Sequence, residues 1–159
     1  VKEINELYPE DLKAAEITDY LAELKSKSFT NLQQNDLLIT SDTIVWFEGM
    51  AIGKPKDNED AFRMLKRMSG KKHCVYTSIS IKSMSFKKVF NDKTIVEFEE
   101  FTDEEINYYL DNFNPYDKAG SYGIQDWIGL IGVKRIEGSY FNVMGLPVHK
   151  LYKELLEIA

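Results

Sequence analysis

The sequence predicts a single α/β domain with a mixed twisted sheet flanked by helices. Its 159 residues suit one domain of ordinary size, so residues 1–159 are treated as one unit. β-Branched apolar segments alternate with segments whose apolar residues recur every three or four positions, which are typical of strands and helices. No internal repeat, low-complexity segment or interdomain linker interrupts this order.

The first third of the chain is predicted to contain a strand end, a helix, a long strand and a turn. Residues 1–4 have the character of the tail of a strand, and the apolar spacing predicts a helix over residues 15–29. Residues 37–47 are strongly apolar and β-branched, as expected of a strand. Glu48-Gly49 then suits a two-residue hairpin turn.

The middle of the chain is predicted to contain a capped helix followed by three strands. Asp57 can cap a helix that Gly70, a residue tolerating positive φ, would end. The apolar face of this helix consists of Ala61, Met64, Leu65 and Met68. Strands are expected over residues 73–81, 86–90 and 94–101, with a turn at Asn91-Asp92 between the last two.

The last third of the chain is predicted to contain two helices, two strands and a functional loop. Thr102 and Glu105 have the spacing of a capping box, and Asn114-Pro115 would stop the helix that they open. Residues 116–127 are rich in glycine, charge and aromatic groups, which indicates a loop with a function. Strands are expected over residues 130–136 and 140–143, before an amphipathic helix that Pro147 begins.

Charge and composition exclude several classes of function. Lys and Arg number 20 against 26 Asp and Glu, giving a net charge of −6, which disfavours a nucleic-acid polymer as partner. No apolar run approaches the roughly 18 residues needed to cross a bilayer, no secretory signal precedes the domain, and the single Cys74 rules out an intrachain disulfide framework. We therefore expect a cytoplasmic enzyme or binding domain without a membrane partner.

Asp42 lies within an apolar strand segment and is the first candidate for chemistry. A carboxylate cannot stay ionised in a dry core without partners, so a place at the mouth of a cleft would suit a general base or a metal ligand. The alternative is an aspartate at a strand end that accepts hydrogen bonds from local backbone amides.

Two later segments carry groups suited to a phosphorylated ligand. Gly53-Lys54-Pro55 precedes a helix, where the Lys54 ammonium can reach phosphate oxygens, although the spacing is not that of a P-loop. Residues 117–125 combine Asp117 and Lys118 with glycines and Gln125, whose amide both donates and accepts toward a base edge. The alternative for residues 117–125 is a glycine-rich connection with a surface ion pair.

Taken in order, these segments resemble the Maf family of nucleotide pyrophosphatases. The resemblance covers nearly the whole chain, and the ordered set is far more specific than any one segment. It rests on Ser41-Asp42-Thr43-Ile44-Val45, Gly53-Lys54-Pro55, residues 65–70, 73–77 and 102–106, Asp117-Lys118-Ala119-Gly120 running to Gln125, and residues 136–147.

The resemblance implies a fold, an activity and several roles. It implies a fold similar to that of inosine-triphosphate pyrophosphatases, a homodimer, and hydrolysis of a nucleoside triphosphate substrate with Mg²⁺ or Mn²⁺. Asp42 resembles the proton acceptor, while Lys54 and Lys25 match the lysines of the Gly-Lys-Pro segment and of the first helix. Glu6 matches an acidic residue of the family. The resemblance therefore implies that Glu6 and Asp42 are the metal ligands.

The resemblance also implies a base preference and a set of substrate contacts. Thr43 and Gln125 occupy positions that resemble the branch acting on dTTP and UTP. Lys118 and Asp117 are expected to contact the substrate, with Lys118 neutralising phosphate oxygens. A nucleotide-binding regulator of cell division or septum formation, without catalysis, is the alternative; a pyrophosphatase directed at inosine or xanthosine nucleotides is a third possibility.

One family segment has no match in this chain. The family begins with a strand and a Ser-x-Ser-Pro-Arg-Arg loop that opens a helix, and its arginines grip the triphosphate. We therefore expect the domain of residues 1–159 to lack that strand, phosphate-binding loop and helix, and to be a poor enzyme without them.

Overall fold

A five-stranded sheet in the order β2-β1-β3-β4-β5 forms the centre of the computed structural model, which describes residues 6–158. Its strands are β1 Leu38–Phe47, β2 Met50–Ile52, β3 Lys72–Lys82, β4 Lys87–Phe98 and β5 Val133–Glu137. All four neighbouring pairs are antiparallel, so the mixed sheet that we predicted is wrong for the described residues. The tight turns at residues 48–49 and 83–86 require the pairs β1–β2 and β3–β4 to be antiparallel, because parallel neighbours need long crossover connections.

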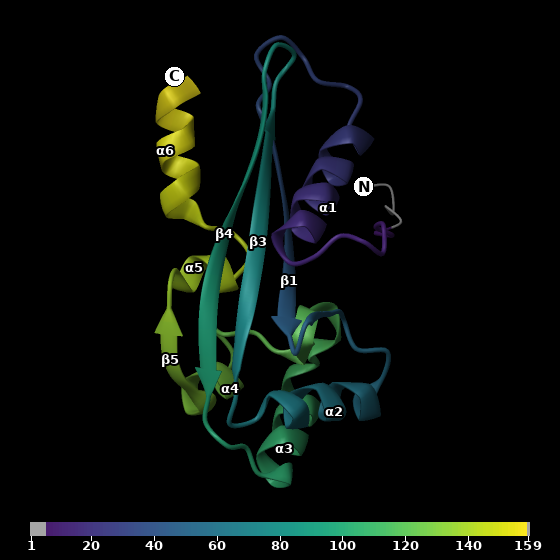
Figure 1. Ribbon diagram of the computed structural model, residues 1–159, viewed down its shortest axis with the longest axis vertical. Helices are drawn as coiled ribbons and strands as arrows, with labels where there is room; N and C mark the ends of the chain where they lie inside the picture. Colours follow the sequence, from purple (N-terminus) through teal and green to yellow (C-terminus); the bar gives the residue numbers. More distant parts are fainter. Residues whose placement is uncertain (1–5, 159) are drawn as a thin grey trace.

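Helices cover both faces of the sheet and one of its ends (Figure 1). Helix α1, Ala15–Ser28, packs on one face across β1, β3 and β4. The opposite face carries α5, Tyr140–Val143, and α6, Val148–Ile158, while α2, Asn58–Met68, and α3, Asp103–Phe113, gather at one end. The remaining helical segments are η1 Pro115–Asp117, η2 Ala119–Ser121 and α4 Trp127–Gly132.

Three apolar clusters hold these layers together. The largest joins α2, α3 and the end of the sheet, and it includes Leu65, Phe98, Ile106, Tyr109 and Ile128. A second cluster, of Ile17, Leu21 and Ile44, holds α1 on its face of the sheet. A third, of Ile79, Ile81 and Leu151, holds α6 on the opposite face.

The predicted helix starts are confirmed by their capping hydrogen bonds. The Asp57 carboxylate accepts from the Asp60 backbone N–H at 2.8 Å. Thr102 and Glu105 form the reciprocal capping box, with the Glu105 N–H donating to the Thr102 hydroxyl at 3.2 Å. These side chains satisfy amides that the first helical turn leaves unpaired, so both α2 and α3 begin where local sequence predicts.

The turn predicted at Asn91-Asp92 is wrong, because β4 runs unbroken from Lys87 to Phe98. Asn91 pairs with Ser78 and Asp92 with Thr77 in the register with β3. Their polar side chains have partners on the helices: Asn91 donates to Asp19 on α1, and Asp92 accepts from Lys150 on α6 at 2.7 Å. These long-range contacts satisfy groups that would otherwise favour a turn.

Of the two strands predicted near the C-terminus, the first is confirmed only in its second half and the other is wrong. Residues 130–136 divide into the end of α4 and strand β5, and residues 140–143 form helix α5. The Ser139 hydroxyl accepts from the Asn142 N–H, a helix cap that outweighs the β-propensity of the aromatic residues after it. The strand end predicted at residues 1–4 lies outside the described residues.

Candidate functional site

The site is a cavity of about 470 Å³ along the open edge of β1. Strand β2 pairs with β1 only from Val45 to Phe47, so over residues 38–44 no described strand covers this edge. Side chains from both faces of β1 therefore line the cavity, which an edge with a paired neighbour would not permit. The predicted site residues all line it: Glu6, Lys25, Asp42, Thr43, Lys54, Asp117, Lys118 and Gln125.

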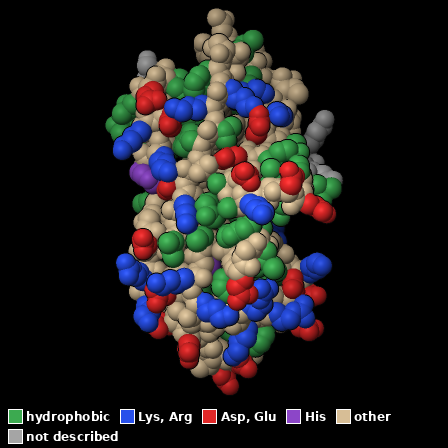
Figure 2. All heavy atoms as spheres, viewed as in Figure 1, with side chains coloured by type: hydrophobic (Ala, Val, Ile, Leu, Met, Phe, Trp, Pro, Cys, Tyr) green, Lys and Arg blue, Asp and Glu red, His purple; other side chains and the backbone are tan. Residues whose placement is uncertain are grey.

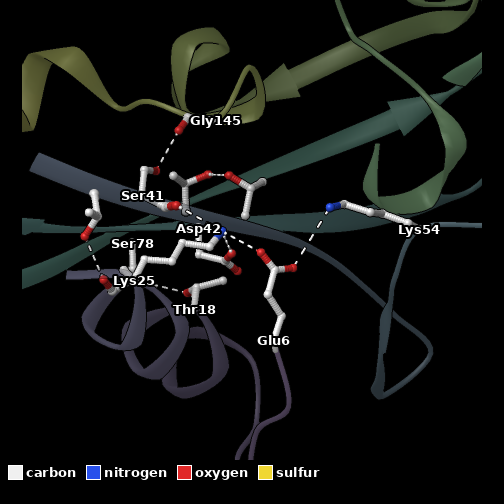
Figure 3. Close-up of polar contacts among 12 residues, drawn as sticks. Glu6, Thr18, Lys25, Ser41, Asp42, Lys54, Ser78 and Gly145 are labelled. Carbon is white, nitrogen blue, oxygen red and sulfur yellow. Dashed lines mark hydrogen bonds and ion pairs between the residues drawn. The ribbon is translucent and has the colours of Figure 1, made fainter. Parts of the chain in front are cut away.

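A lysine joins two carboxylates at one wall of the cavity (Figure 3). The Lys25 ammonium on α1 donates to Asp42 Oδ1 at 2.5 Å and lies 3.1 Å from Glu6 Oε1. Lys54 reaches toward the same glutamate from the opposite side, with its Nζ 4.0 Å from Glu6 Oε2. Residues far apart in sequence thus form one alternating chain of charges.

Burial sets the ionisation of the Asp42–Lys25 pair. Asp42 is only 8% exposed, and this burial raises the pKa of its carboxyl above the usual value, although the hydrogen bond from Lys25 opposes the rise. Burial acts to lower the pKa of Lys25, but Asp42 and Glu6 outweigh it, so the net pKa of Lys25 is raised. Lys25 therefore stays a cation beside a carboxylate of increased basicity.

A buried polar network positions α1, and with it Lys25. Ser78 Oγ donates to Asp19 Oδ1 at 2.6 Å and lies 2.6 Å from Thr18 Oγ1. Ser78 is also the register partner of Asp42, so both side chains lie on the face that α1 covers. Lys25 is seven residues beyond Thr18, about two helical turns along the same side of α1. The network therefore aligns Lys25 with Asp42.

The loop of residues 116–125 closes the cavity from the other side of β1. The Gly120 N–H donates to the Gly53 carbonyl oxygen at 3.0 Å, which ties this loop to the segment that carries Lys54. Gly120 has φ +71°, and a Cβ there would lie 2.9 Å from Val45 Cγ2, so only glycine lets the loop approach β1 so closely. Lys118 pairs with Asp117 at 2.8 Å, and this hydrogen bond lowers the pKa of Asp117.

Sequence reasoning missed several groups that shape the site. The Ser41 hydroxyl donates to the Gly145 carbonyl oxygen at 2.8 Å and so connects β1 to the segment after α5. Thr77 lies behind Thr43, with 2.9 Å between their hydroxyl oxygens. Both Ser41 and Thr77 lie in segments that carried the family resemblance, but no local pattern distinguishes them from ordinary strand residues.

The carboxylates present fit a divalent cation only in part. Among residues 6–158, no group of three or more His, Cys, Asp or Glu side chains is placed to hold a metal ion. Glu6 and Asp42 nevertheless converge on one cation, the Lys25 ammonium, within 3.1 Å. Mg²⁺ is commonly held by one or two carboxylates together with substrate phosphates, and this pair fits that mode.

The distribution of charged side chains on the surface is consistent with a small-molecule ligand. On the face that Figure 2 shows, acidic and basic side chains are interspersed, without a continuous basic stripe. Among residues 6–158, no helix combines the length and apolar character needed to cross a membrane. Fold and site together define an α/β protein whose open strand edge carries a cavity of lysines and carboxylates, suited to a phosphorylated small molecule.

Comparison with known proteins identifies the family. The profile of the Maf-like protein family matches residues 1–158, and the chain belongs to this family. The chain is similar to a dTTP/UTP pyrophosphatase of Christiangramia forsetii, with 55% identity over 99% of this chain and 81% of that relative. It is also similar to dTTP/UTP pyrophosphatases of Flavobacterium psychrophilum, at 55% identity, and Bacteroides thetaiotaomicron, at 46%, each over 98% of this chain and about four fifths of the relative.

Proposed function

We propose that this protein hydrolyses dTTP and UTP to the nucleoside monophosphate and pyrophosphate. The observation that carries the proposal is the cavity at the open edge of β1, where all eight predicted site residues meet. The relatives named dTTP/UTP pyrophosphatase, at 46–55% identity over nearly the whole chain, support the same activity. The cavity volume also lies in the range of about 300–1,000 Å³ that is usual for small-molecule sites.

The proposed reaction is attack of water on the α-phosphorus. The bond from water oxygen to phosphorus forms while the bond from phosphorus to the α,β-bridging oxygen breaks, which releases pyrophosphate. Asp42 accepts the proton that the attacking water loses, a role favoured by its raised pKa and by its place in the cavity wall. Positioning and charge neutralisation supply the remaining stabilisation, as in other phosphoryl transfers.

Three lysines are assigned to the triphosphate. Lys25 and Lys54 flank Glu6, with 3.1 and 4.0 Å between their nitrogens and its carboxylate oxygens. Lys118 approaches from the loop on the other side of the cavity, paired with Asp117. Phosphate oxygens can displace these carboxylate contacts, so each ammonium would exchange one anionic partner for another.

Glu6 and Asp42 are assigned to a divalent cation, Mg²⁺ or Mn²⁺. Both carboxylates lie within hydrogen-bond distance of the Lys25 ammonium, so they already face a shared point of positive charge. Bound there with the substrate, the cation would supply neutralisation of phosphate charge. The protein's own contribution is to hold the two carboxylates and three lysines around one ligand.

Further properties of the family extend this proposal. Phe141, Tyr152 and Leu156 on α5 and α6 are each more than half exposed, and burial against a second copy in a homodimer would remove them from water. A fold similar to that of inosine-triphosphate pyrophosphatases is part of the same proposal. A cytoplasmic location follows from the substrates, because nucleoside triphosphates are cytoplasmic metabolites.

A nucleotide panel tests the proposed function. The full-length protein, supplied with Mg²⁺ or Mn²⁺, is expected to release pyrophosphate and a monophosphate from dTTP and UTP faster than from ATP, GTP, CTP, ITP or XTP. Products separated by anion exchange distinguish pyrophosphate from orthophosphate. Nucleotide binding without turnover would favour the regulator of cell division, and preference for ITP or XTP would favour the third possibility.

A further inference from the structure

A chain of two hydroxyl groups links the cavity wall to the protein interior. Thr43 on β1 and Thr77 on β3 are register partners, and their Oγ1 atoms lie 2.9 Å apart. Thr77 Oγ1 in turn donates to the Asn142 backbone carbonyl oxygen at 2.8 Å. Thr43 is half-buried and lines the cavity, whereas Thr77 is fully buried behind it.

The direction of this chain is fixed by counting protons. A hydroxyl group carries one proton, and a carbonyl oxygen can only accept. Thr77 therefore uses its proton on Asn142, so the hydrogen bond between the threonines has Thr43 as its donor. Thr43 is left with lone pairs alone, and it can present only an acceptor to the cavity.

The inner end of the chain is held rigidly. Asn142 is fully buried, and its Nδ2 donates to the Val75 carbonyl oxygen at 3.1 Å and to Thr94 Oγ1 at 3.0 Å. Its backbone N–H is occupied by the Ser139 cap of α5. The Asn142 carbonyl oxygen also accepts from the Gly145 backbone N–H at 3.0 Å, but reversing the chain would leave this oxygen and Thr77 Oγ1 2.8 Å apart with no proton between them. That repulsion between lone pairs makes the acceptor state of Thr43 the stable one.

We infer that Thr77 is a positioning residue for base specificity, which keeps Thr43 as an acceptor for a ring N–H of the ligand. This inference rests on the proposed function. Uracil and thymine carry a proton on ring N3, whereas cytosine has a lone pair there, so an obligate acceptor faces a donor in the first two and a second acceptor in the third. A site whose buried polar groups match one base rejects the base that leaves them unpaired.

Replacing Thr77 with valine tests the inference, because valine keeps the volume and removes the hydroxyl group. Thr43 then regains a free proton and can donate to cytosine N3. We expect Thr77→Val to lower the preference for UMP over CMP in calorimetric binding by about tenfold. The ratio of kcat/KM for UTP over CTP should fall similarly in the full-length protein, and Thr77→Ser should restore both.

The matched control is Thr40→Val on β1. Thr40 is also a strand threonine whose hydroxyl donates to a carbonyl oxygen, that of Ala22 at 2.7 Å, but it has no place in the Thr43–Thr77 chain. This control should leave both ratios unchanged. Thr43→Val should lower the UMP preference even if Thr77→Val fails to fold, and adding Thr77→Val to Thr43→Val should have no further effect on specificity.

The two readouts separate the inference from the proposed function. Wild-type protein that binds or hydrolyses cytidine and uridine nucleotides equally would overturn the inference, as would a Thr77→Val protein with wild-type ratios. Loss of affinity for both monophosphates by the same factor would show a merely structural role and would also overturn it. Selective UMP binding without hydrolysis of UTP would overturn only the proposed function.

Discussion

At the scale of single residues, His73 combines deep burial with a titratable group. It is 2% exposed, its Nε2 lies 2.7 Å from the Tyr122 hydroxyl oxygen, and Tyr122 lines the cavity. Burial lowers the pKa of His73 to about 4, so the imidazole is neutral in the folded protein at neutral pH. The partner of Tyr122, which lines the cavity wall, is therefore an uncharged imidazole.

This burial predicts a loss of stability in mild acid. Because the unfolded chain binds a proton near pH 6.5 and the folded protein only near pH 4, the free energy of unfolding should fall as pH decreases through this window. Between pH 7 and 5, His73 should account for about 2 kcal/mol of that fall. Urea unfolding of the wild type and His73→Gln measures it, and the variant should show the smaller pH dependence.

An equal pH dependence in wild type and His73→Gln would count against a neutral buried His73.

At the scale of elements, the docking of α1 on the sheet depends on Ser78. Its hydroxyl group contacts the side chains of Thr18 and Asp19, which both belong to α1, the helix that carries Lys25. Ser78→Ala should reduce the free energy of unfolding by about 1 kcal/mol, because the hydrogen bond to Asp19 is lost while Asp19 keeps Asn91 and Thr18 keeps the Ala15 carbonyl oxygen as partners. It should also lower the turnover of UTP, since Lys25 would lose its alignment with Asp42. Chemical denaturation and pyrophosphate release measure the two effects.

Ser80→Ala is the matched control for this prediction. Ser80 lies two residues further along β3 and is fully buried, but within the described residues its hydroxyl group has no hydrogen-bond partner. Its removal should leave stability and turnover close to wild type. Equal losses in Ser78→Ala and Ser80→Ala would show that the network does not position α1.

Elements whose signals are local could be predicted from the sequence. The capping residues Asp57 and Thr102 place α2 and α3 correctly, and the apolar run of residues 37–47 places β1. The turn predicted at Asn91-Asp92 is wrong because the hydrogen-bond partners of these two side chains are distant in sequence. They lie on α1 and α6, more than 50 residues away. The antiparallel sheet order is likewise a long-range property, which local periodicity does not contain.

At the scale of the whole molecule, the open edge of β1 explains why the site lies where it does. Residues from α1, β1 and two loops meet there because β2 is too short to cover the strand. Residue chemistry identified Asp42, Lys54 and Gln125 as candidates, but their meeting in one cavity followed from the family resemblance and not from spacing. Which threonine donates in the Thr43–Thr77 hydrogen bond could be deduced only from the structure, because it depends on the hydrogen bond from Thr77 to Asn142.

The most direct test of the account compares pyrophosphate release from UTP by the full-length wild-type protein and its Asp42→Asn variant. Loss of the general base should lower kcat by about 10²- to 10⁴-fold. The asparagine keeps the size of the side chain, so calorimetric binding of UMP should remain. Turnover by Asp42→Asn within a few-fold of wild type would contradict the account and would place the catalytic base elsewhere.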